Sequence, residues 1–297
     1  MSPREKAVVL IDGPAVVHRW YHRWSYSRER YGKEIDLKQF AIKNARYMIA
    51  TAHSFDPAHM AQHLLSPQTE YAHTPKHNRV VVCFDQGDGG RRLLYSAYKA
   101  NRLDKVVTPE FRLLERVAKK VFGDEPRDSL LIVPDCDTRL ASLNAEADDM
   151  IATIALFNQQ SKVPTVVMSH DYDLYQLVDE ARRSFHYDIR TKHLVSERGV
   201  LERVGVHPKL VRDFKSLAGD SSDNIPGVSG IGKVRARNLL KKYGNLDSVL
   251  SRGAKGESGH LSEVLTKGAE SALISRQLVD FRMCPKLLKV YESFARQ

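Results

Sequence analysis

Cysteine is scarce in this chain of 297 residues. The three cysteines, Cys83, Cys136 and Cys284, lie far apart and form no pair at the spacing of metal ligands. Disulfide scaffolds and structural zinc sites both need closely patterned cysteines. The sequence therefore predicts neither of them, and a reducing compartment suits it.

Long apolar runs are also missing at the amino terminus. The charged residues Arg4, Glu5 and Lys6 are followed by only a short apolar stretch, residues 7–11. Such a stretch is too short for the core of a signal peptide or for a membrane span. There is also no internal repeat and no low-complexity tract. We therefore expect a cytoplasmic protein that does not bind membranes.

Acidic residues are outnumbered by basic ones. Lys and Arg total 46 and Asp and Glu 36, which gives a formal net charge of +10, while 42% of the residues are hydrophobic. The hydrophobic fraction is ordinary for a globular protein with a sizeable core. The charge favours a polyanionic partner, but ribosome-associated and membrane-surface proteins share it. Charge alone therefore does not decide the function.

Short apolar runs alternate with helical patterns in the first two thirds of the chain. The runs lack the period-two alternation of half-exposed strands, as expected for strands buried on both faces, and span residues 7–11, 80–84, 130–133 and 165–168. Helical patterns cover residues 37–52, 109–122 and 145–157. This order predicts an α/β fold with a mostly parallel central sheet flanked by helices. Residues 54–78, rich in His, Pro, Gln and Thr, predict a loop or insertion.

Three of the predicted strands run directly into a carboxylate. These residues are Asp12, Asp85 and Asp171. In an open parallel sheet the carboxyl ends of the strands meet at one edge, which is where ligands bind. We therefore expect the three carboxylates to lie close together.

Further acids occur in three groups near these strands. Glu146, Asp148 and Asp149 open a helical pattern, Asp173 follows Asp171, and a turn-rich segment contains two more; the full set of metal-binding candidates is Asp12, Asp85, Glu146, Asp148, Asp149, Asp171, Asp173, Asp220 and Asp223. Each acid alone has an ordinary explanation as a helix-start or turn residue. Gathered together they would repel one another unless cations neutralised them.

Oxygen ligands without patterned Cys or His favour Mg²⁺ or Mn²⁺ over zinc. Two such ions about 4 Å apart can activate water and stabilise a leaving oxygen in phosphoryl displacement. The chemistry that the acids predict is therefore phosphodiester hydrolysis.

A glycine-rich turn precedes a basic amphipathic helix. Residues 225–233 place three glycines among small apolar residues, and 234–240 continue as a helical pattern. Glycine allows close backbone approach, and the N–H groups of a helix start can bind a phosphate. This pattern predicts a helix-hairpin-helix that binds the backbone of duplex DNA without reading its sequence. The residues expected to contact DNA here are Gly230, Gly232, Lys233, Arg235 and Arg237.

Residues 91–102 mix cations with tyrosines. This composition suits phosphate contact and base stacking, and it also suits a solvated amphipathic helix. Its position directly after Asp85 favours the functional interpretation, in which Arg91 and Arg92 bind DNA.

The ordered set of motifs resembles the 5′-nuclease superfamily, which includes flap endonucleases, phage 5′-exonucleases and the 5′-nuclease domain of bacterial DNA polymerase I. The similarity covers nearly the whole chain. Its motifs are Leu10-Ile11-Asp12-Gly13, Arg19-Trp20-Tyr21-His22, Phe84-Asp85, Tyr98-Lys99-Ala100-Asn101-Arg102, Glu146-Ala147-Asp148-Asp149, Asp171-Tyr172-Asp173-Leu174 and Gly219-Asp220-Ser221-Ser222-Asp223-Asn224-Ile225-Pro226-Gly227. The resemblance implies a PIN-like catalytic domain at 1–207, with a helical arch at about 86–125, and a helix-hairpin-helix region at 208–297.

The resemblance also implies roles for individual residues. Asp12, Asp85, Glu146 and Asp148 would hold a first divalent cation with Asp149 close by, and Asp171, Asp173, Asp220 and Asp223 a second. On the arch, Lys99 and Arg102 would stabilise charge on the scissile phosphate beside Tyr98. The further residues expected to contact DNA are Arg19, Tyr21 and Lys215. Backbone carbonyls around Val228, Ser229 and Ile231 would hold a potassium ion.

Two positions depart from the family pattern. Tyr172 stands where polymerase-associated members usually have lysine, so one cation is lost although both neighbouring acids are kept. Val234 stands where some relatives have lysine, flanked here by Lys233 and Arg235. The chain also ends soon after the hairpin, which suggests a phage enzyme or a free-standing bacterial paralogue without a polymerase domain.

Three functions remain open at this stage. The first is a monomeric structure-specific 5′-nuclease with 5′–3′ exonuclease and flap endonuclease activity on branched or 5′-ended DNA, in replication or repair, with RNA–DNA primer hybrids as further substrates. The second is a related metal-dependent ribonuclease, against which the duplex-binding hairpin argues. The third is a non-catalytic module for branched DNA, against which the presence of all nine acids argues. We expect the first.

Overall fold

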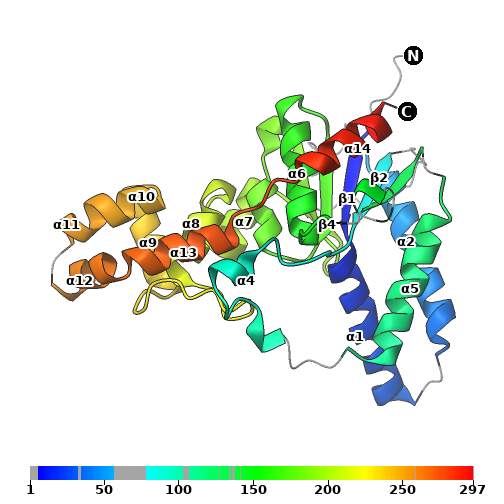
Figure 1. The fold of residues 1–297 in the computed structure, drawn as a ribbon, viewed down its shortest axis with the longest axis horizontal. Coiled ribbons are helices and arrows are strands. Elements are labelled where there is room, and N and C mark those ends of the chain that lie inside the picture. Colours follow the sequence, from blue (N-terminus) through cyan, green and yellow to red (C-terminus); the bar gives the residue numbers. More distant parts are fainter. Residues whose placement is uncertain are drawn as a thin grey trace. The chain divides into compact units, whose positions relative to one another are not determined.

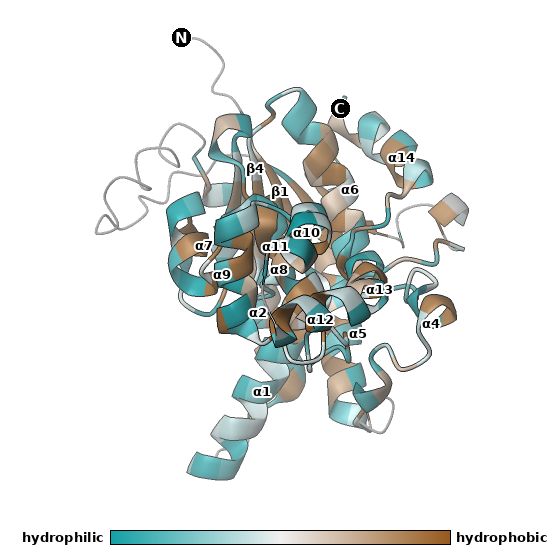
Figure 2. Ribbon diagram, turned by 90° about the vertical axis from the view of Figure 1, so that its left-hand side faces the viewer, coloured by the Kyte–Doolittle hydropathy of each residue, from teal (hydrophilic) through white to brown (hydrophobic). Residues whose placement is uncertain are grey.

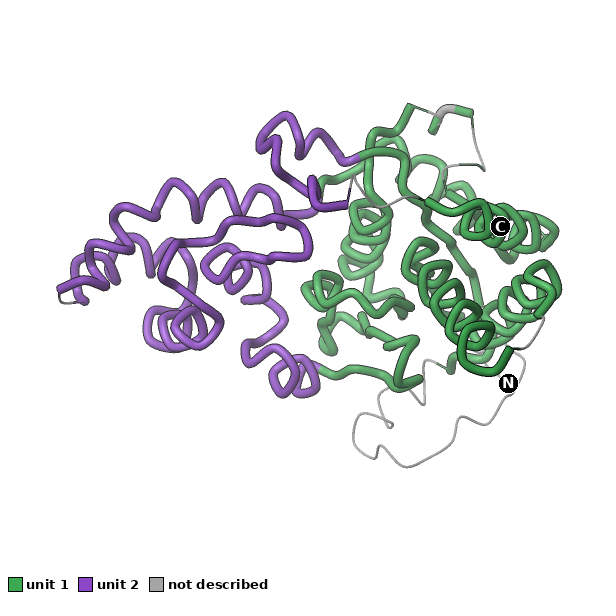
Figure 3. The backbone as a smooth tube through the Cα atoms, turned by 90° about the horizontal axis from the view of Figure 1, so that it is seen from below, with its two compact units in different colours: residues 1–87, 107–196, 282–297 green, residues 88–106, 197–281 purple. Residues whose placement is uncertain are grey.

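The computed structural model describes residues 6–32, 35–56, 78–102, 107–126, 128–133, 135, 138–140, 142–257 and 259–296. Most of the predicted loop at 54–78, as well as Cys136, lies outside these residues. The chain forms two compact units. Unit 1 comprises residues 1–87, 107–196 and 282–297, and unit 2 comprises residues 88–106 and 197–281 (Figure 3).

Unit 1 contains a single six-stranded sheet with the strand order β3-β2-β1-β4-β5-β6. The strands are β1 (Val8–Asp12), β2 (Arg79–Cys83), β3 (Leu130–Val133), β4 (Thr165–Ser169), β5 (Ser184–Asp188) and β6 (His193–Val195). All neighbours pair in parallel except β5 and β6. Because β1, β2 and β4 are buried almost throughout, they contain β-branched residues without alternation.

Helices cover both faces of this sheet (Figure 1). One layer consists of α1 (Gly13–Tyr31), α2 (Leu37–Ser54) and α5 (Pro109–Gly123), and the other of α6 (Ala147–Gln160) and α14 (Pro285–Ala295). Val9 and Ile11 of β1 face the first layer and share its core with Trp20 and Phe122. Figure 2 shows the contrast in hydropathy between the apolar strands β1 and β4 and the hydrophilic outer part of α1.

Short polar residues start the helices of the first layer. Asp12 accepts a hydrogen bond from the Ala15 N–H at 3.0 Å, and Asp36 and Thr108 cap α2 and α5 in the same way. Capping by such residues stabilises a helix by about 1 kcal/mol. The same side chain of Asp12 thus ends a strand and starts a helix, which fixes its carboxylate at the sheet edge.

Unit 2 is helical. It contains α4 (Arg91–Leu94), η1 (Ala100–Arg102), α7 (Glu197–Val204), η5 (Pro208–Leu210), α8 (Val211–Ala218), α9 (Lys233–Tyr243), α10 (Leu246–Ser248), η6 (Val249–Gly253), α11 (Ala254–Gly256), α12 (His260–Lys267) and α13 (Ala269–Val279). Short 3₁₀ helices in unit 1 complete the fold: η2 (Thr138–Leu140), η3 (Asp173–Leu177) and η4 (Glu180–Arg182). In the described part of the chain, no helix is both long and apolar enough to cross a membrane.

The α/β prediction is confirmed, and the four predicted strands and three predicted helices are present. The sequence reasoning missed α1, β5 and β6. The segment predicted as an arch comprises α4, η1 and α5, with residues 103–106 outside the described residues. Of these, α5 packs on α2 and β3 in unit 1 and buries Leu114, Ala118 and Phe122.

Candidate active site and nucleic-acid interface

The carboxyl edge of the sheet in unit 1 carries three carboxylates from neighbouring strands. Asp12 is the last residue of β1 and lies opposite Cys83 of β2. Asp85 follows Cys83 by two residues, and Asp171 follows the end of β4 at Ser169 by two residues. The strand register therefore brings the three acids to one edge, as the sequence predicted.

Of the three acids, Asp12 is the most buried, with 4% of its surface exposed. It accepts hydrogen bonds from the Ala15 N–H at 3.0 Å and from the Ser169 hydroxyl at 2.5 Å. Burial raises the pKa of Asp12 to about 7, with smaller contributions from the charges of Asp171 and Asp85 and against the hydrogen bonds from Ser169 and Ala15. The charges of Asp171 and Asp85 therefore act on Asp12, and a cation among these carboxylates would be stabilised by their combined charge.

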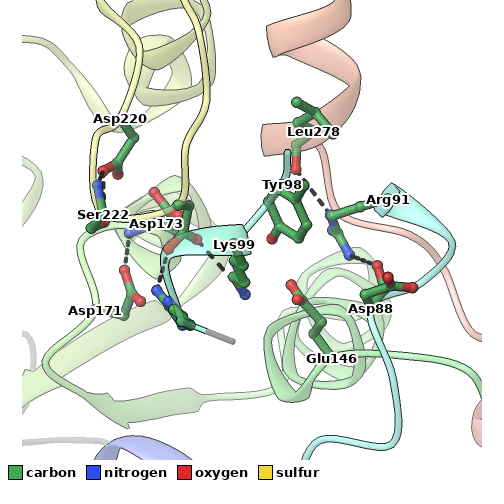
Figure 4. A network of polar contacts seen from close by, with 12 residues as sticks. Asp88, Arg91, Tyr98, Lys99, Glu146, Asp171, Asp173, Asp220, Ser222 and Leu278 are labelled. Atoms are coloured by element: carbon green, nitrogen blue, oxygen red, sulfur yellow. Dashed lines mark hydrogen bonds and ion pairs between the residues drawn. The ribbon is translucent and has the colours of Figure 1, made fainter. Parts of the chain in front are cut away.

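Hydrogen bonds from neutral donors hold the other two strand-end carboxylates. Asp85 accepts from the Ala147 N–H at 2.7 Å, at the start of α6. Asp171 accepts from the Asp173 N–H at 2.8 Å and donates its own N–H to the Ser169 hydroxyl at 2.9 Å (Figure 4). Ser169 therefore connects the carboxylate of Asp12 to the backbone of Asp171.

The start of α6 contributes three acids with different surroundings. Asp149 is fully buried and accepts from the Glu146 N–H at 3.3 Å and from the Arg282 N–H at 2.9 Å. It therefore secures both the first turn of α6 and the segment that leads to α14. Glu146 is 7% exposed. Asp148, which directly precedes Asp149 in the helix, is half-buried.

Two acids of unit 2 are paired with basic side chains. The carboxylate of Asp220 lies 2.7 Å from the Lys215 ammonium and also accepts from the hydroxyl and N–H of Ser222 (Figure 4). Burial opposes ionisation of Asp220, but Lys215 and Ser222 outweigh it and lower its pKa to about 2.

Asp223 is neutralised by two cations of the segment 91–102. Its carboxylate lies 3.7 Å from the Lys99 ammonium and forms an ion pair with Arg102. The backbone N–H of Lys99 also donates to the Asp223 carbonyl at 2.9 Å. Lys99 and Arg102, predicted to act on a phosphate, are thus placed together by an acid.

The same segment also places residues in the interior of unit 2. Arg91 is 2% exposed and donates to the carbonyls of Leu278 and Asp280 at 2.9 Å each (Figure 4). Tyr98 is equally buried and packs with Ile225 and Leu278. The predicted DNA contact by Arg91 and the catalytic role of Tyr98 need correction, because side chains enclosed in this way cannot touch a substrate. Arg92 is partly exposed, 3.8 Å from Asp88.

The predicted hairpin is a pair of turns between α8 and α9. Gly227 and Gly230 have φ values of 62° and 84°, which favour glycine, and a Cβ at Gly227 would lie 2.3 Å from the Gly219 nitrogen. The Val228 carbonyl accepts from the Ile231 N–H at 2.9 Å, with Ser229 between them. Gly232 caps α9 without a side chain, so the helix start is open.

The basic residues of α9 differ in orientation. Lys233 and Arg235 are exposed at the start of the helix, and Arg235 donates to the Gly230 carbonyl. Arg237 is directed inward, donating to the Val204 carbonyl at 2.8 Å and lying 5.5 Å from the Phe214 ring. The first two are therefore available for phosphate binding, whereas Arg237 supports packing.

A family model for the N-terminal, resolvase-like domain of 5′–3′ exonucleases matches residues 7–205, and one for their C-terminal SAM fold matches residues 206–295. The chain belongs to the 5′–3′ exonuclease family. The predicted resemblance is therefore confirmed.

Relatives in this family include DNA polymerase I of Rhizobium leguminosarum, 34% identical over 72% of this chain and 20% of that protein. DNA polymerase I of Chloroflexus aurantiacus is 30% identical over 91% of this chain and 26% of that protein. The 5′–3′ exonuclease of Buchnera aphidicola is 29% identical over 58% of this chain and 56% of that protein. The chain spans about a fifth to a quarter of the length of these polymerases.

Solved structures support the fold. A bacteriophage T5 flap endonuclease in a complex with DNA and metal ions has a TM-score of 0.70 at 18% identity, over 98% of this chain and 100% of that one. The T5 5′-exonuclease with bound zinc has a TM-score of 0.64 at 18% identity, over 98% of this chain and 99% of that one. At this identity the likeness establishes the shared 5′-nuclease fold.

The residues of unit 1 fit a divalent cation in kind, because the edge offers hard carboxylate oxygens and a buried acid whose charge needs a counterion. Across the residues that the structure describes, no three His, Cys, Asp or Glu side chains already converge as a metal site. The carboxylates instead accept hydrogen bonds from N–H and hydroxyl groups of the fold.

Sequence reasoning missed two residues that shape this edge. The Ser169 hydroxyl links Asp12 and Asp171. The sequence could have indicated this residue, because Ser169 stands at the end of a strand, level with Asp12. Asp188 ends β5 fully buried and level with Ser169, and it was missed because β5 was not predicted. Of the predicted contacts on α1, Arg19 reaches the Arg190 carbonyl at 3.4 Å, and Tyr21 packs edge-on against Phe111.

Proposed function

We propose that the chain is a structure-specific 5′-nuclease that hydrolyses DNA phosphodiesters, acting as a 5′–3′ exonuclease and as a 5′-flap endonuclease. The observation that carries the proposal is the placement of Asp12, Asp85 and Asp171 at the carboxyl ends of neighbouring parallel strands, along one sheet edge. A protein with a net charge of +10 retains this concentration of acid where α/β proteins bind ligands.

The acids of unit 1 would hold the cations, Mg²⁺ or Mn²⁺, that the chemistry needs. These residues are Asp12, Asp85, Glu146, Asp148, Asp171 and Asp173. Two bound cations would supply an activated water and stabilise the leaving oxygen. The Ser169 hydroxyl orients Asp12, and the helix starts of α1 and α6 orient Asp12 and Asp85. The ligand roles predicted for Asp220 and Asp223 stay predictions.

Unit 2 would contribute substrate binding. Lys233, Arg235 and the open start of α9 would bind a phosphate of the duplex, with a potassium ion on the carbonyls of 228–231. Lys99 and Arg102 would stabilise negative charge on the phosphate that is cut, and Lys215 would bind nearby DNA. The positive charge of these groups favours binding that weakens with salt.

The substrates that we propose are flap, nicked or gapped DNA and the RNA–DNA hybrids at primers, bound by a monomer in the cytoplasm. The test is cleavage of a 5′-flap DNA labelled at either end, with magnesium, with a chelator, and with the flap end blocked. A matched substrate with an RNA 5′ strand measures the sugar preference.

Magnesium-dependent release of the flap at the junction is the expected result. Loss of release when the 5′ end is blocked would show that the strand must enter end first. Tight binding of the flap DNA without any cleavage in magnesium or manganese would instead identify a non-catalytic binding module and contradict the proposal.

A further inference from the structure

An arginine beyond the predicted site is fixed beside the acids of unit 1. Arg190 follows β5, and its guanidinium contacts the buried Asp188 through Nε at 3.3 Å and Nη2 at 3.2 Å. The N–H of Arg190 donates to the same carboxylate at 2.8 Å. Asp188 therefore holds both the backbone and the side chain of Arg190, and a planar guanidinium held on two atoms keeps one orientation.

The held guanidinium remains open to solvent. The side chain of Arg190 is 40% exposed, whereas that of Asp188 is 0% exposed. Hydrogen bonding to Asp188 raises the pKa of Arg190 against the effect of burial, so the group stays charged.

An aromatic ring lies against the exposed part of this arginine. The Arg190 guanidinium carbon is 5.4 Å from the centre of the Tyr172 ring, which is 40% exposed. Tyr172 stacks on the buried Tyr175, with ring centres 5.0 Å apart and planes at 19°. The ring therefore contacts Tyr175 and the Arg190 guanidinium, and Tyr172 stays partly exposed. Its neighbours in the chain are Asp171 and Asp173.

Arg19 adds a second guanidinium to this place. It donates to the Arg190 carbonyl at 3.4 Å, and burial lowers its pKa, with Arg23 and Arg190 adding to the effect while Asp188 opposes it. Arg19 and Arg190 therefore place two guanidinium groups near the carboxylate of Asp188. Two cations beside a partly exposed ring suit a nucleic-acid strand, whose phosphates need cations and whose bases need flat surfaces.

We propose that Arg190, oriented by Asp188, binds a phosphate of the single-stranded part of the substrate next to the cleavage site, and that Tyr172 stacks on an adjacent base. This subsite rests on the proposed nuclease function and adds to it a phosphate contact in unit 1. Arg190 and Tyr172 are binding residues, and Asp188 is a positioning residue.

The test compares Arg190→Gln with the wild type on a fluorescent 5′-flap DNA, by anisotropy in chelator over a range of salt and by kinetics in magnesium. Loss of a charged phosphate contact predicts about tenfold weaker binding, and a salt dependence reduced by about one phosphate. We expect KM to rise and kcat to stay near the wild-type value. The control is Lys192→Gln, which removes an equal charge from the same turn, where Lys192 contacts Tyr47.

Tyr172 provides two further arms. Tyr172→Ala should weaken binding about fivefold with a normal flap and not with an abasic flap, because stacking needs a base. In the Arg190→Gln background, Tyr172→Lys should restore part of the affinity, because the lysine returns a positive charge close to position 190. Circular dichroism checks folding, and if Arg190→Gln does not fold, Tyr172→Ala with the abasic flap decides alone.

Unchanged affinity and salt dependence in Arg190→Gln, or equal losses in Arg190→Gln and Lys192→Gln, would overturn the subsite. So would equal losses of Tyr172→Ala on normal and abasic flaps. A wild-type protein that fails to cleave the flap would overturn the proposed function instead, so the two failures are distinguishable.

Discussion

The candidate site acids of the two units are compensated in opposite ways. In unit 1, Asp12, Asp85 and Asp171 accept hydrogen bonds from backbone N–H groups and one hydroxyl. In unit 2, Asp220 and Asp223 are paired with Lys215, Lys99 and Arg102. Among the ion pairs of the described residues, none involves the three acids of unit 1.

The aspartate side chain thus has different roles in the two units. Neutral donors position a carboxylate but leave its charge, so the edge of unit 1 attracts cations from solution. Basic partners balance the negative charge, and the pKa of about 2 for Asp220 shows that this carboxylate stays ionised beside Lys215. These partners also bring cations that can bind phosphate. We therefore predict that substituting the site acids of unit 1 mainly impairs metal binding. Substituting the basic residues of unit 2 should mainly impair the interaction with the substrate.

The largest effect is expected from Asp171→Asn. The asparagine keeps an oxygen that can accept from the Asp173 N–H, so the turn should remain while the charge is lost. We expect cleavage of 5′-flap DNA to fall by at least about a thousandfold, because metal-assisted catalysis is lost. Binding in chelator, measured by anisotropy, should stay within about threefold of the wild type. Equal losses of binding and cleavage would contradict this division.

Lys99→Ala should have the next largest effect. Its ammonium lies near Asp223 and would stabilise charge on the phosphate in the transition state. We expect kcat to fall about a hundredfold, as for other electrostatic contacts to developing charge. Duplex affinity should change little. A large loss of affinity at unchanged kcat would show that Lys99 holds substrate without acting on the reaction.

Asp149→Ala should affect stability. It leaves the buried N–H groups of Glu146 and Arg282 without their carboxylate acceptor, which should destabilise the fold by about 2–3 kcal/mol. Denaturant unfolding measures this loss. The matched change Asp148→Ala, at a half-buried neighbour, should reduce cleavage with little effect on stability. The reverse outcome would exchange the roles of the two acids.

The smallest effect is expected at the hairpin. Lys233→Ala removes an exposed cation at the start of α9 and should weaken duplex binding about tenfold, with a salt dependence lower by about one phosphate. Arg237→Ala removes an internal contact to Val204 and Phe214 and should lower the unfolding midpoint with less effect on binding. Binding losses of equal size would show that Arg237 also contacts DNA.

Much of the sheet and its acidic edge could be predicted from the sequence, because β1, β2 and β4 are apolar runs that end at Asp12, Asp85 and Asp171. β5 was missed because Ser184, His186 and Asp188 are polar yet fully buried, which hides a buried strand.

The orientation of the basic residues could not be predicted from the sequence. Arg91 and Arg237 stand in the same basic segments as Arg92 and Arg235, so the sequence does not distinguish them. Only tertiary contacts direct Arg91 and Arg237 inward. Similarly, the hydroxyl of Ser169 becomes a link between two acids only when β1 and β4 pair. These features depend on contacts between residues that are distant in the chain.

The most direct test of this account is manganese binding followed by the paramagnetic resonance of free Mn²⁺, for the wild type and for Asp12→Asn. The asparagine retains the acceptor for the Ala15 N–H, so the fold should be kept while the charge at the edge falls. The account predicts that the wild type binds Mn²⁺ and that Asp12→Asn loses at least one bound ion together with flap cleavage. Equal Mn²⁺ binding by both proteins, or cleavage by the wild type in excess chelator, would contradict it.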